Sequence, residues 1–262
     1  MLTFAAITPH TPLLIPTIGK DNIKKLDATA KGFQTLAQSF AEASCDTVII
    51  ISSHASQHAD AFSINLHDEY RTDFKDFGDM GTTKEFQPDL ELITQIQRMS
   101  RDQQVPFTLN STASLDHGIG VPLHYLTENV PSPKIVPLSY SGLSSKDHLK
   151  FGNLLKDLID QSHRRIGVIA SGDLSHCLTS DAPLGFRKEG ELFDEAIQQA
   201  VAGSSTSTLL AMDDELPKQA GSCLYQRLLV LFGILERKKA RPEILSYEAP
   251  FGVGYLVAQF HV

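Results

Sequence analysis

Short runs of apolar, β-branched residues recur along the chain, and loop-forming residues bound each of them. Such runs are typical of buried strands rather than helices. They predict strands over Leu2–Ile7, Thr47–Ser52, Phe62–Leu66, Lys134–Ser139, Arg165–Ala170 and Ile244–Phe260. The last run contains Gly252 and Gly254, so it is either two strands or a bulged hairpin.

Helical patterns lie between these runs. In Asp27–Ala43, apolar residues return at steps of three and four, which places them on one face of a helix. The same spacing occurs in Asp89–Arg101, Lys146–Ser162, Gly190–Ala202 and Ser222–Arg237. This alternation of strands and helices predicts an α/β fold, a mixed β-sheet covered by helices on both faces. No repeat, low-complexity tract or linker divides the sequence, so we expect a single domain over residues 1–262.

The segment Asp68–Gln87 departs from both patterns. It is polar, contains two glycines, and carries the aromatic residues Tyr70, Phe74, Phe77 and Phe86. Long loops inside compact domains are usually functional or mobile. We therefore expect this segment to be a long loop that forms an insertion or a lid.

Composition narrows the class of protein. The hydrophobic share of 42% and the charged share of 21% are ordinary for a globular chain. The 31 acidic residues against 23 basic ones give a net charge of −8, which argues against a nucleic-acid surface and against an anionic membrane as partner. The three cysteines lack CxxC spacing, and no basic leader or long apolar run is present, so we expect a cytoplasmic protein without a membrane span.

The candidate chemistry lies in histidines at the ends of predicted strands. His10, His54 and His176 each follow a strand closely, and His117 follows a short extended stretch. Any one histidine at a strand end is more often a structural, hydrogen-bonded residue. In open α/β sheets, however, ligands bind outside the carboxyl ends of the strands, so these four side chains are expected to converge there. Imidazole is a common ligand for iron, zinc and copper.

Cys223 is a further candidate because Gly221 and Ser222 precede it and a strongly apolar helix follows. A thiol at the start of a helix is favoured as the thiolate, which is the form that binds a metal or attacks a substrate. A cysteine that simply packs under the first helical turn is an equally good interpretation of the same residues.

Six sequence blocks resemble those of one enzyme family. In order, they are ITPHTPLL, IIISSHAS, LDHGIGVPLHYL, ASGDLSH, AGSC with LLVLFGIL, and SYEAPFGVGYLVA. Each is short, but the ordered set spans nearly the whole chain. It is similar to the class III extradiol ring-cleavage dioxygenase superfamily, the family of the B subunit of protocatechuate 4,5-dioxygenase. The closer likeness is to the branch of the Memo proteins and the AmmeMemoRadiSam system protein B group.

The resemblance implies a role for each candidate residue. It makes His10 and His54 metal ligands, His176 the acid–base residue, and His117 a residue that lines the substrate pocket. The family's third ligand is a glutamate that opens a late helix, and here Cys223 occupies the matching position, as in the Memo-like branch. Two carboxylates, Glu248 and Glu215, rank below Cys223 as alternatives.

The resemblance implies a non-haem metal-dependent oxidoreductase of the extradiol dioxygenase type. It would act with O₂ on a small, catechol-like aromatic substrate. Fe(2+) is the expected metal, and the softer Cys223 donor also suits Zn or Cu. A homodimer or a small partner protein is expected by analogy with relatives.

Two alternatives come from other functional classes. One is a Memo-like accessory protein that binds iron or copper without cleaving a ring, because cysteine replaces the glutamate. The other is a hydrolase that uses Cys223 or Ser175 as nucleophile beside His176. The hydrolase has less support because no GxSxG elbow is present and Ser175 is directly adjacent to its supposed base.

Overall fold

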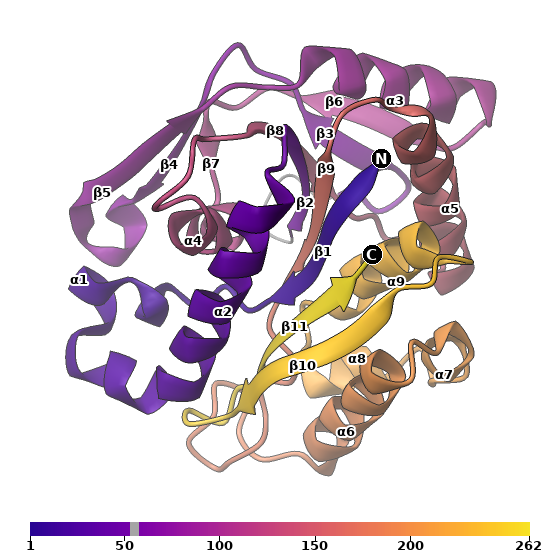
Figure 1. The fold of residues 1–262 in the computed structure, drawn as a ribbon. Helices are drawn as coiled ribbons and strands as arrows, with labels where there is room; N and C mark the ends of the chain where they lie inside the picture. Colours follow the sequence, from indigo (N-terminus) through magenta and orange to yellow (C-terminus); the bar gives the residue numbers. More distant parts are fainter. Residues whose placement is uncertain (53–57) are drawn as a thin grey trace.

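The structure, a computed structural model, describes residues 1–52 and 58–262. Its main sheet has the strand order β10-β11-β1-β9-β2-β8-β3-β6 (Figure 1). The strands are β1 (Leu2–Thr8), β2 (Thr47–Ser52), β3 (Phe62–Asn65), β6 (Phe107–Asn110), β8 (Lys134–Ser139), β9 (Ile166–Ser171), β10 (Arg241–Glu248) and β11 (Tyr255–His261). All six predicted strand segments are confirmed within a few residues, and the C-terminal one forms two strands.

The middle of the sheet is parallel and its flanks are mixed. Strands β1, β9, β2 and β8 run in the same direction. Strand β11 pairs with β1 antiparallel, and β3 pairs with β8 antiparallel. The predicted mixed sheet is thus confirmed. The carboxyl ends of the four parallel strands meet at one edge of the sheet, where α/β proteins bind their ligands.

Helices cover both faces. Within β2, Val48 and Ile50 belong to one apolar core cluster while Ile49 and Ile51 belong to the other, because alternate side chains of a strand point to opposite faces. The first cluster packs against α2 (Asp27–Ala43) and α4 (His117–Leu126). The second packs against α3 (Leu90–Asp102), α5 (Ser145–Gln161), α6 (Lys188–Ala202) and α9 (Tyr225–Leu235). The predicted helices on both faces are therefore confirmed.

Shorter helical turns connect these elements. They are η1 (Pro12–Leu14), α1 (Pro16–Gly19), η2 (Lys20–Leu26), α7 (Thr206–Leu210) and α8 (Leu216–Ala220). No helix in the described ranges is both long enough and apolar enough to cross a bilayer. The expectation of a single domain over residues 1–262 stays a prediction.

The expectation of a loop over Asp68–Gln87 is wrong. The segment forms β4 (Tyr70–Phe74), the turn η3 (Lys75–Phe77) and β5 (Asp79–Phe86), which join β7 (Ser114–Leu115) in a second, three-stranded sheet. Tyr70, Thr72 and Phe74 are buried while the residues between them are partly exposed. This alternation is a strand signal that the segment's polar composition concealed. The small sheet packs beside α4, next to the carboxyl ends of the central strands (Figure 1).

Candidate functional site

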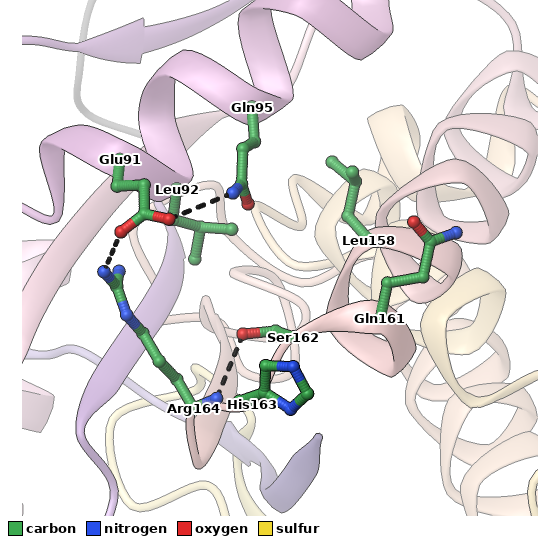
Figure 2. Close-up of a pocket in the computed structure, with 8 residues that line it drawn as sticks. All are labelled: Glu91, Leu92, Gln95, Leu158, Gln161, Ser162, His163 and Arg164. Carbon is green, nitrogen blue, oxygen red and sulfur yellow. Dashed lines mark hydrogen bonds and ion pairs between the residues drawn. The ribbon is translucent and has the colours of Figure 1, made fainter.

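One pocket lies at the edge of the sheet opposite to the carboxyl ends of the central strands, away from the predicted site. Figure 2 shows this pocket, of about 390 Å³, at the amino end of β9. Arg164 in its wall is ion-paired with Glu91 and also with Asp89. Arg164, Asp89 and Glu91 are thus engaged with one another, and His10, His117 and His176 are not among the residues that line this pocket.

The predicted site begins with His10, which follows β1 and is only 3% exposed. Its backbone N–H donates to Oδ1 of Asp173 at 2.9 Å, and its Nδ1 lies 3.2 Å from Oγ of Ser171. The Ser171 hydroxyl donates its own hydrogen to the carbonyl of Gly118. Ser171 must therefore accept a hydrogen from Nδ1 of His10, so in the neutral ring Nε2 is the nitrogen that carries the lone pair.

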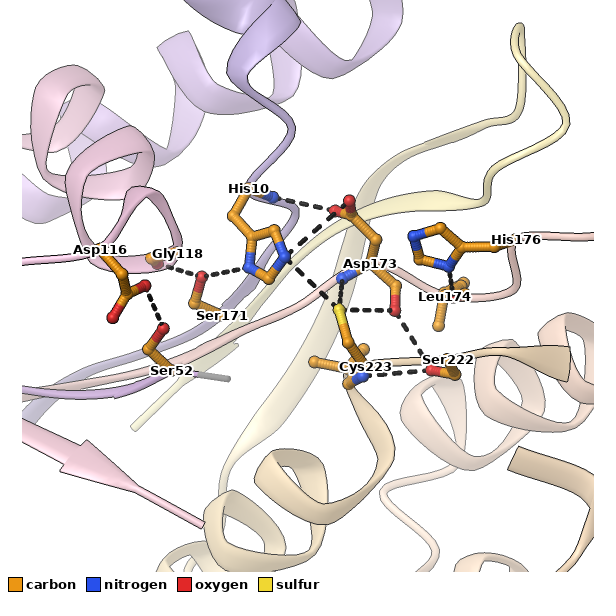
Figure 3. Close-up of polar contacts among 11 residues, drawn as sticks. His10, Ser52, Asp116, Gly118, Ser171, Asp173, Leu174, His176, Ser222 and Cys223 are labelled. Carbon is orange, nitrogen blue, oxygen red and sulfur yellow. Dashed lines mark hydrogen bonds and ion pairs between the residues drawn. The ribbon is translucent and has the colours of Figure 1, made fainter. Parts of the chain in front are cut away.

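Cys223 lies where Nε2 of His10 points. The Nε2–Sγ distance is 3.4 Å, and Oδ2 of Asp173 lies 4.0 Å from the same nitrogen (Figure 3). Two hydrogen bonds hold Cys223 to Asp173: the Cys223 backbone N–H donates to the Asp173 carbonyl, and the Asp173 backbone N–H donates to Sγ at 3.1 Å. The segment that follows β9 is thus hydrogen-bonded to the segment that leads into α9, beside the end of β1.

The two side chains are electrostatically coupled. Burial lowers the pKa of His10, but the Cys223 thiolate and Asp173 outweigh burial and raise this pKa to about 9. Burial raises the pKa of Cys223, but His10 and Arg227 outweigh it and lower this pKa. Each group therefore stabilises the charged form of the other. A metal cation would take the place of the proton on His10, as metals do when they bind imidazole and thiolate.

The spacing of these two donors fits a shared metal ion. A nitrogen and a sulfur bound to one zinc-like ion lie about 3.1 Å apart at a right angle and about 3.6 Å apart at a tetrahedral angle. The 3.4 Å between Nε2 of His10 and Sγ of Cys223 falls between these values. His54, the other predicted ligand, lies outside the described residues. Within residues 1–52 and 58–262, no group of three or more His, Cys, Asp and Glu side chains has the arrangement of a metal site.

His117 and Phe77 form an aromatic wall beside His10. The His117 ring meets the His10 ring edge-on with centroids 5.3 Å apart, and Phe77 meets His117 from another side at 5.0 Å. Burial and the neighbouring His10 lower the pKa of His117 to about 4. His117 is therefore neutral near pH 7, where it can donate one hydrogen bond and accept another.

His176 makes its hydrogen bonds to backbone carbonyl groups rather than to a carboxylate. Its Nδ1 lies 3.2 Å from the carbonyl oxygen of Leu174, and its backbone N–H donates to the Ala220 carbonyl. The group that orients the His176 ring is thus a backbone carbonyl. The Asp173 carboxylate instead accepts from His10 (Figure 3). The proposed catalytic role of His176 stays a prediction.

The two alternative carboxylates have other partners. Oε1 of Glu248 accepts the backbone N–H of Thr29 at 2.6 Å. Glu215 is exposed and ion-paired with Lys218. Cys223 is the candidate third donor that the structure brings to His10.

Sequence reasoning missed several residues that shape the site. Ser52 and Ser171 are the last residues of neighbouring strands, and Ser52 donates to Oδ1 of Asp116 at 2.6 Å. A side chain at Gly118 would have its Cβ 3.2 Å from Nδ1 of His10 and closer still to Asp116 and Ser52. In the Asp116-His117-Gly118 triplet, the aspartate and the glycine therefore also shape the site, besides the histidine. The position of a serine at a strand end was the signal that could have revealed these contacts.

Comparisons with known proteins agree with this architecture. The model of one family, the catalytic LigB subunit of aromatic ring-opening dioxygenase, matches residues 4–258. Protein CA_C1420 of Clostridium acetobutylicum is 32% identical over 258 residues, which cover 95% of this chain and 55% of that protein. The chain thus spans about half the length of this curated relative. The crystal structure of the uncharacterized protein JW3007 from Escherichia coli K12 superposes with a TM-score of 0.70 at 17% identity and covers 98% of both chains, which shows a shared fold.

Proposed function

The chain belongs to the family of the catalytic LigB subunit of aromatic ring-opening dioxygenases, and from that membership we propose a non-haem metal-dependent oxidoreductase of the extradiol type. The proposed substrate is a small, catechol-like aromatic compound, and O₂ is the proposed co-substrate. The observation that carries the proposal is the approach of Nε2 of His10 to Sγ of Cys223, at 3.4 Å, where the parallel strands end.

The proposed metal ligands are His10, His54 and Cys223. Fe(2+) bound by such a set would supply open positions where a catechol and O₂ meet. A thiolate is a softer donor than the family's glutamate, so zinc and copper are the alternative metals. Asp173 and Ser171 contribute by fixing the orientation of His10, as partners of a ligating histidine usually do.

The remaining roles belong to two histidines. His176 takes a proton from a substrate hydroxyl and returns it when product forms, which is general acid–base catalysis. His117, neutral near pH 7, donates a hydrogen bond to the negative oxygen that this deprotonation leaves. The aromatic wall of His117 and Phe77 covers one side of the bound ring.

A ring-cleavage assay tests the proposal. Protein purified without oxygen is loaded with Fe(2+), Zn or Cu, and a panel of catechols is then added together with O₂. We expect a yellow ring-opened product, formed with one O₂ consumed per substrate. His176→Ala is expected to slow the reaction by about 100-fold or more while keeping the metal. His163→Ala is the matched control, because His163 is exposed at the opposite edge of the sheet. Absence of cleavage with every metal and every catechol would refute the activity.

A second candidate function rests on Cys223 itself. We propose, as the alternative, a metal-binding accessory protein for iron or copper that has no ring-cleavage activity. The supporting observation is that the donor placed against His10 is a sulfur, which favours softer metals than oxygen donors do. Tight metal binding that depends on Cys223, together with no cleavage of any catechol, would select this alternative.

A further inference from the structure

Arg227 is a buried cation whose donors lack an acceptor. It lies in the first turn of α9, four residues after Cys223, and is 0% exposed. Within the described part of the chain, none of its Nε, Nη1 and Nη2 atoms has a hydrogen-bond partner. Burial of a guanidinium is costly when its lost hydration is not replaced. A buried cation of this kind, which breaks the usual rules of stable packing, is expected where a functional site requires it.

An aromatic ring lies against the guanidinium. Its central carbon lies 4.2 Å from the centroid of the Tyr140 ring. Attraction to an aromatic face acts through the charge of the guanidinium and does not use up its N–H donors. Asp116 and Asp173 make hydrogen bonds to Ser52 and His10, and neither is hydrogen-bonded to Arg227. Because its three nitrogens make no hydrogen bond within the described residues, Arg227 has N–H groups left for an acceptor from outside the described chain.

Arg227 lies close to the candidate metal centre. Its charge contributes to lowering the pKa of Cys223 and opposes the rise in the pKa of His10. Tyr140, whose ring lies against it, and Gln226, which precedes it, both line a pocket of about 530 Å³. Tyr140 is half-buried and contacts both the guanidinium and this pocket, so access of a ligand to Arg227 from the pocket would require this ring to move.

We propose that Arg227 is a recognition residue for a carboxylate group on the ligand of this site. The two parallel N–H donors of a guanidinium edge match the two oxygens of a carboxylate. The inference deepens the proposed function, because it rests on the ligand occupying the same site. A planar monoanion suits the position better than a phosphate dianion does. Asp116, Asp173 and the Cys223 sulfur already place negative charge nearby.

Binding of a simple aromatic carboxylate tests the proposal. Benzoate is titrated by calorimetry into the protein as purified and after metal removal with a chelator. Benzamide and inorganic phosphate serve as the neutral and the dianionic comparison. The variants are Arg227→Met, Arg227→Lys and, as a control with the same change in net charge, Arg98→Met. Arg98 is exposed on α3.

We expect wild type and Arg98→Met to bind benzoate in preference to benzamide and phosphate. Arg227→Met is expected to weaken benzoate binding by about tenfold or more, since a charge-assisted, bidentate contact is lost. Arg227→Lys keeps the positive charge but loses the pair of parallel N–H donors. Its affinity for benzoate should therefore lie between those of wild type and Arg227→Met. Because Met fills a similar volume without a buried charge, the melting temperature of Arg227→Met should rise by roughly 2–4 °C.

Several results would overturn the proposal. Two concern the variants: wild-type affinity for benzoate in Arg227→Met, or wild-type affinity in Arg227→Lys. The other two concern the ligand: benzamide that binds as tightly as benzoate, or phosphate that binds more tightly than benzoate. A lower melting temperature in Arg227→Met would instead assign Arg227 a structural role. The chelated protein separates this inference from the proposed function. Arg227-dependent binding without metal upholds the carboxylate site even where ring cleavage is absent.

Discussion

Replacement of Gly118 by alanine tests how tightly the site is packed around His10. The added Cβ would lie 2.7 Å from Oδ1 of Asp116 and 3.2 Å from Nδ1 of His10, and nearer still to Oγ of Ser52. Contacts this close force neighbours to move, and overpacking of this kind costs about 1–3 kcal/mol. Alanine also favours the helix by about 0.5–1 kcal/mol over glycine. The net loss of stability is therefore about 0–2.5 kcal/mol.

The effect on metal binding should be larger than the effect on stability. A displaced imidazole no longer presents Nε2 toward Cys223, and changes in the groups that orient a ligating histidine typically weaken metal affinity by about 10–100-fold. Competition with a chromophoric chelator measures the affinity of Gly118→Ala and wild type for zinc. Thermal unfolding of the metal-free proteins measures stability separately.

Gly120→Ala is the matched control. Gly120 lies on the same helix and gains the same helix propensity, but its Cβ would meet the tip of the Phe74 ring at 3.2 Å rather than His10. We expect its metal affinity to match wild type. Wild-type affinity in Gly118→Ala, or an equal loss in Gly120→Ala, would refute the reasoning that Gly118 keeps space for a ligating imidazole.

Three further predictions concern other parts of the site and fold. Ser171→Ala removes the acceptor 3.2 Å from Nδ1 of His10 and should weaken zinc affinity by about tenfold, with chelator competition as the measurement. Phe77→Ala should weaken the binding of 4-nitrocatechol, measured by the absorption change of this compound, and should leave the metal content unchanged. Met80→Ala is the control, because Met80 lies on the same hairpin and is 70% exposed, and it should change neither quantity. Burial raises the pKa of Asp89, but its hydrogen bonds from arginine and threonine outweigh burial and lower this pKa from 3.8. The ionised form is thus the one that stabilises the fold, so Asp89→Asn should cost about 1.5–3 kcal/mol at pH 7 in denaturant unfolding. This difference from wild type should begin to shrink as pH falls below 3.8 and should be small once pH is below the lowered pKa of Asp89 in the folded protein; a difference that stays constant down to the lowest pH at which the protein folds would contradict the assignment.

Much of the fold could be predicted because its signals are local. Buried parallel strands such as Thr47–Ser52 are continuous apolar runs, and the amphipathic spacing of Asp27–Ala43 is unambiguous. The small sheet could not be recognised in the same way. Its exposed face is polar and one of its strands, Ser114–Leu115, has only two residues. Such a strand exists through pairing with Tyr70–Phe74, and pairing is not encoded in either segment by itself.

The candidate site was predictable in its residue types and less so in its contacts. The ordered motifs named His10 and Cys223, and the structure brings their side chains together. The hydrogen bonds of Ser171 and Asp173 to His10 join residues more than 160 positions apart. Local patterns carry no information on such contacts. The burial of Arg227 was equally hidden, because an arginine in a helical segment ordinarily points to solvent.

Metal content measured together with the metal's ligand atoms tests the central claim most directly. Wild-type protein purified without oxygen should hold a single metal ion per chain, and X-ray absorption should show a sulfur at about 2.3 Å from it. His10→Ala, His54→Ala and Cys223→Ala should each lose most of the metal, and Cys223→Ala should lose the sulfur signal. Cys45→Ala, which removes a thiol near Thr3, should keep both. Full metal content in His10→Ala and Cys223→Ala, or a bound metal without a sulfur neighbour, would contradict a centre built on His10 and Cys223.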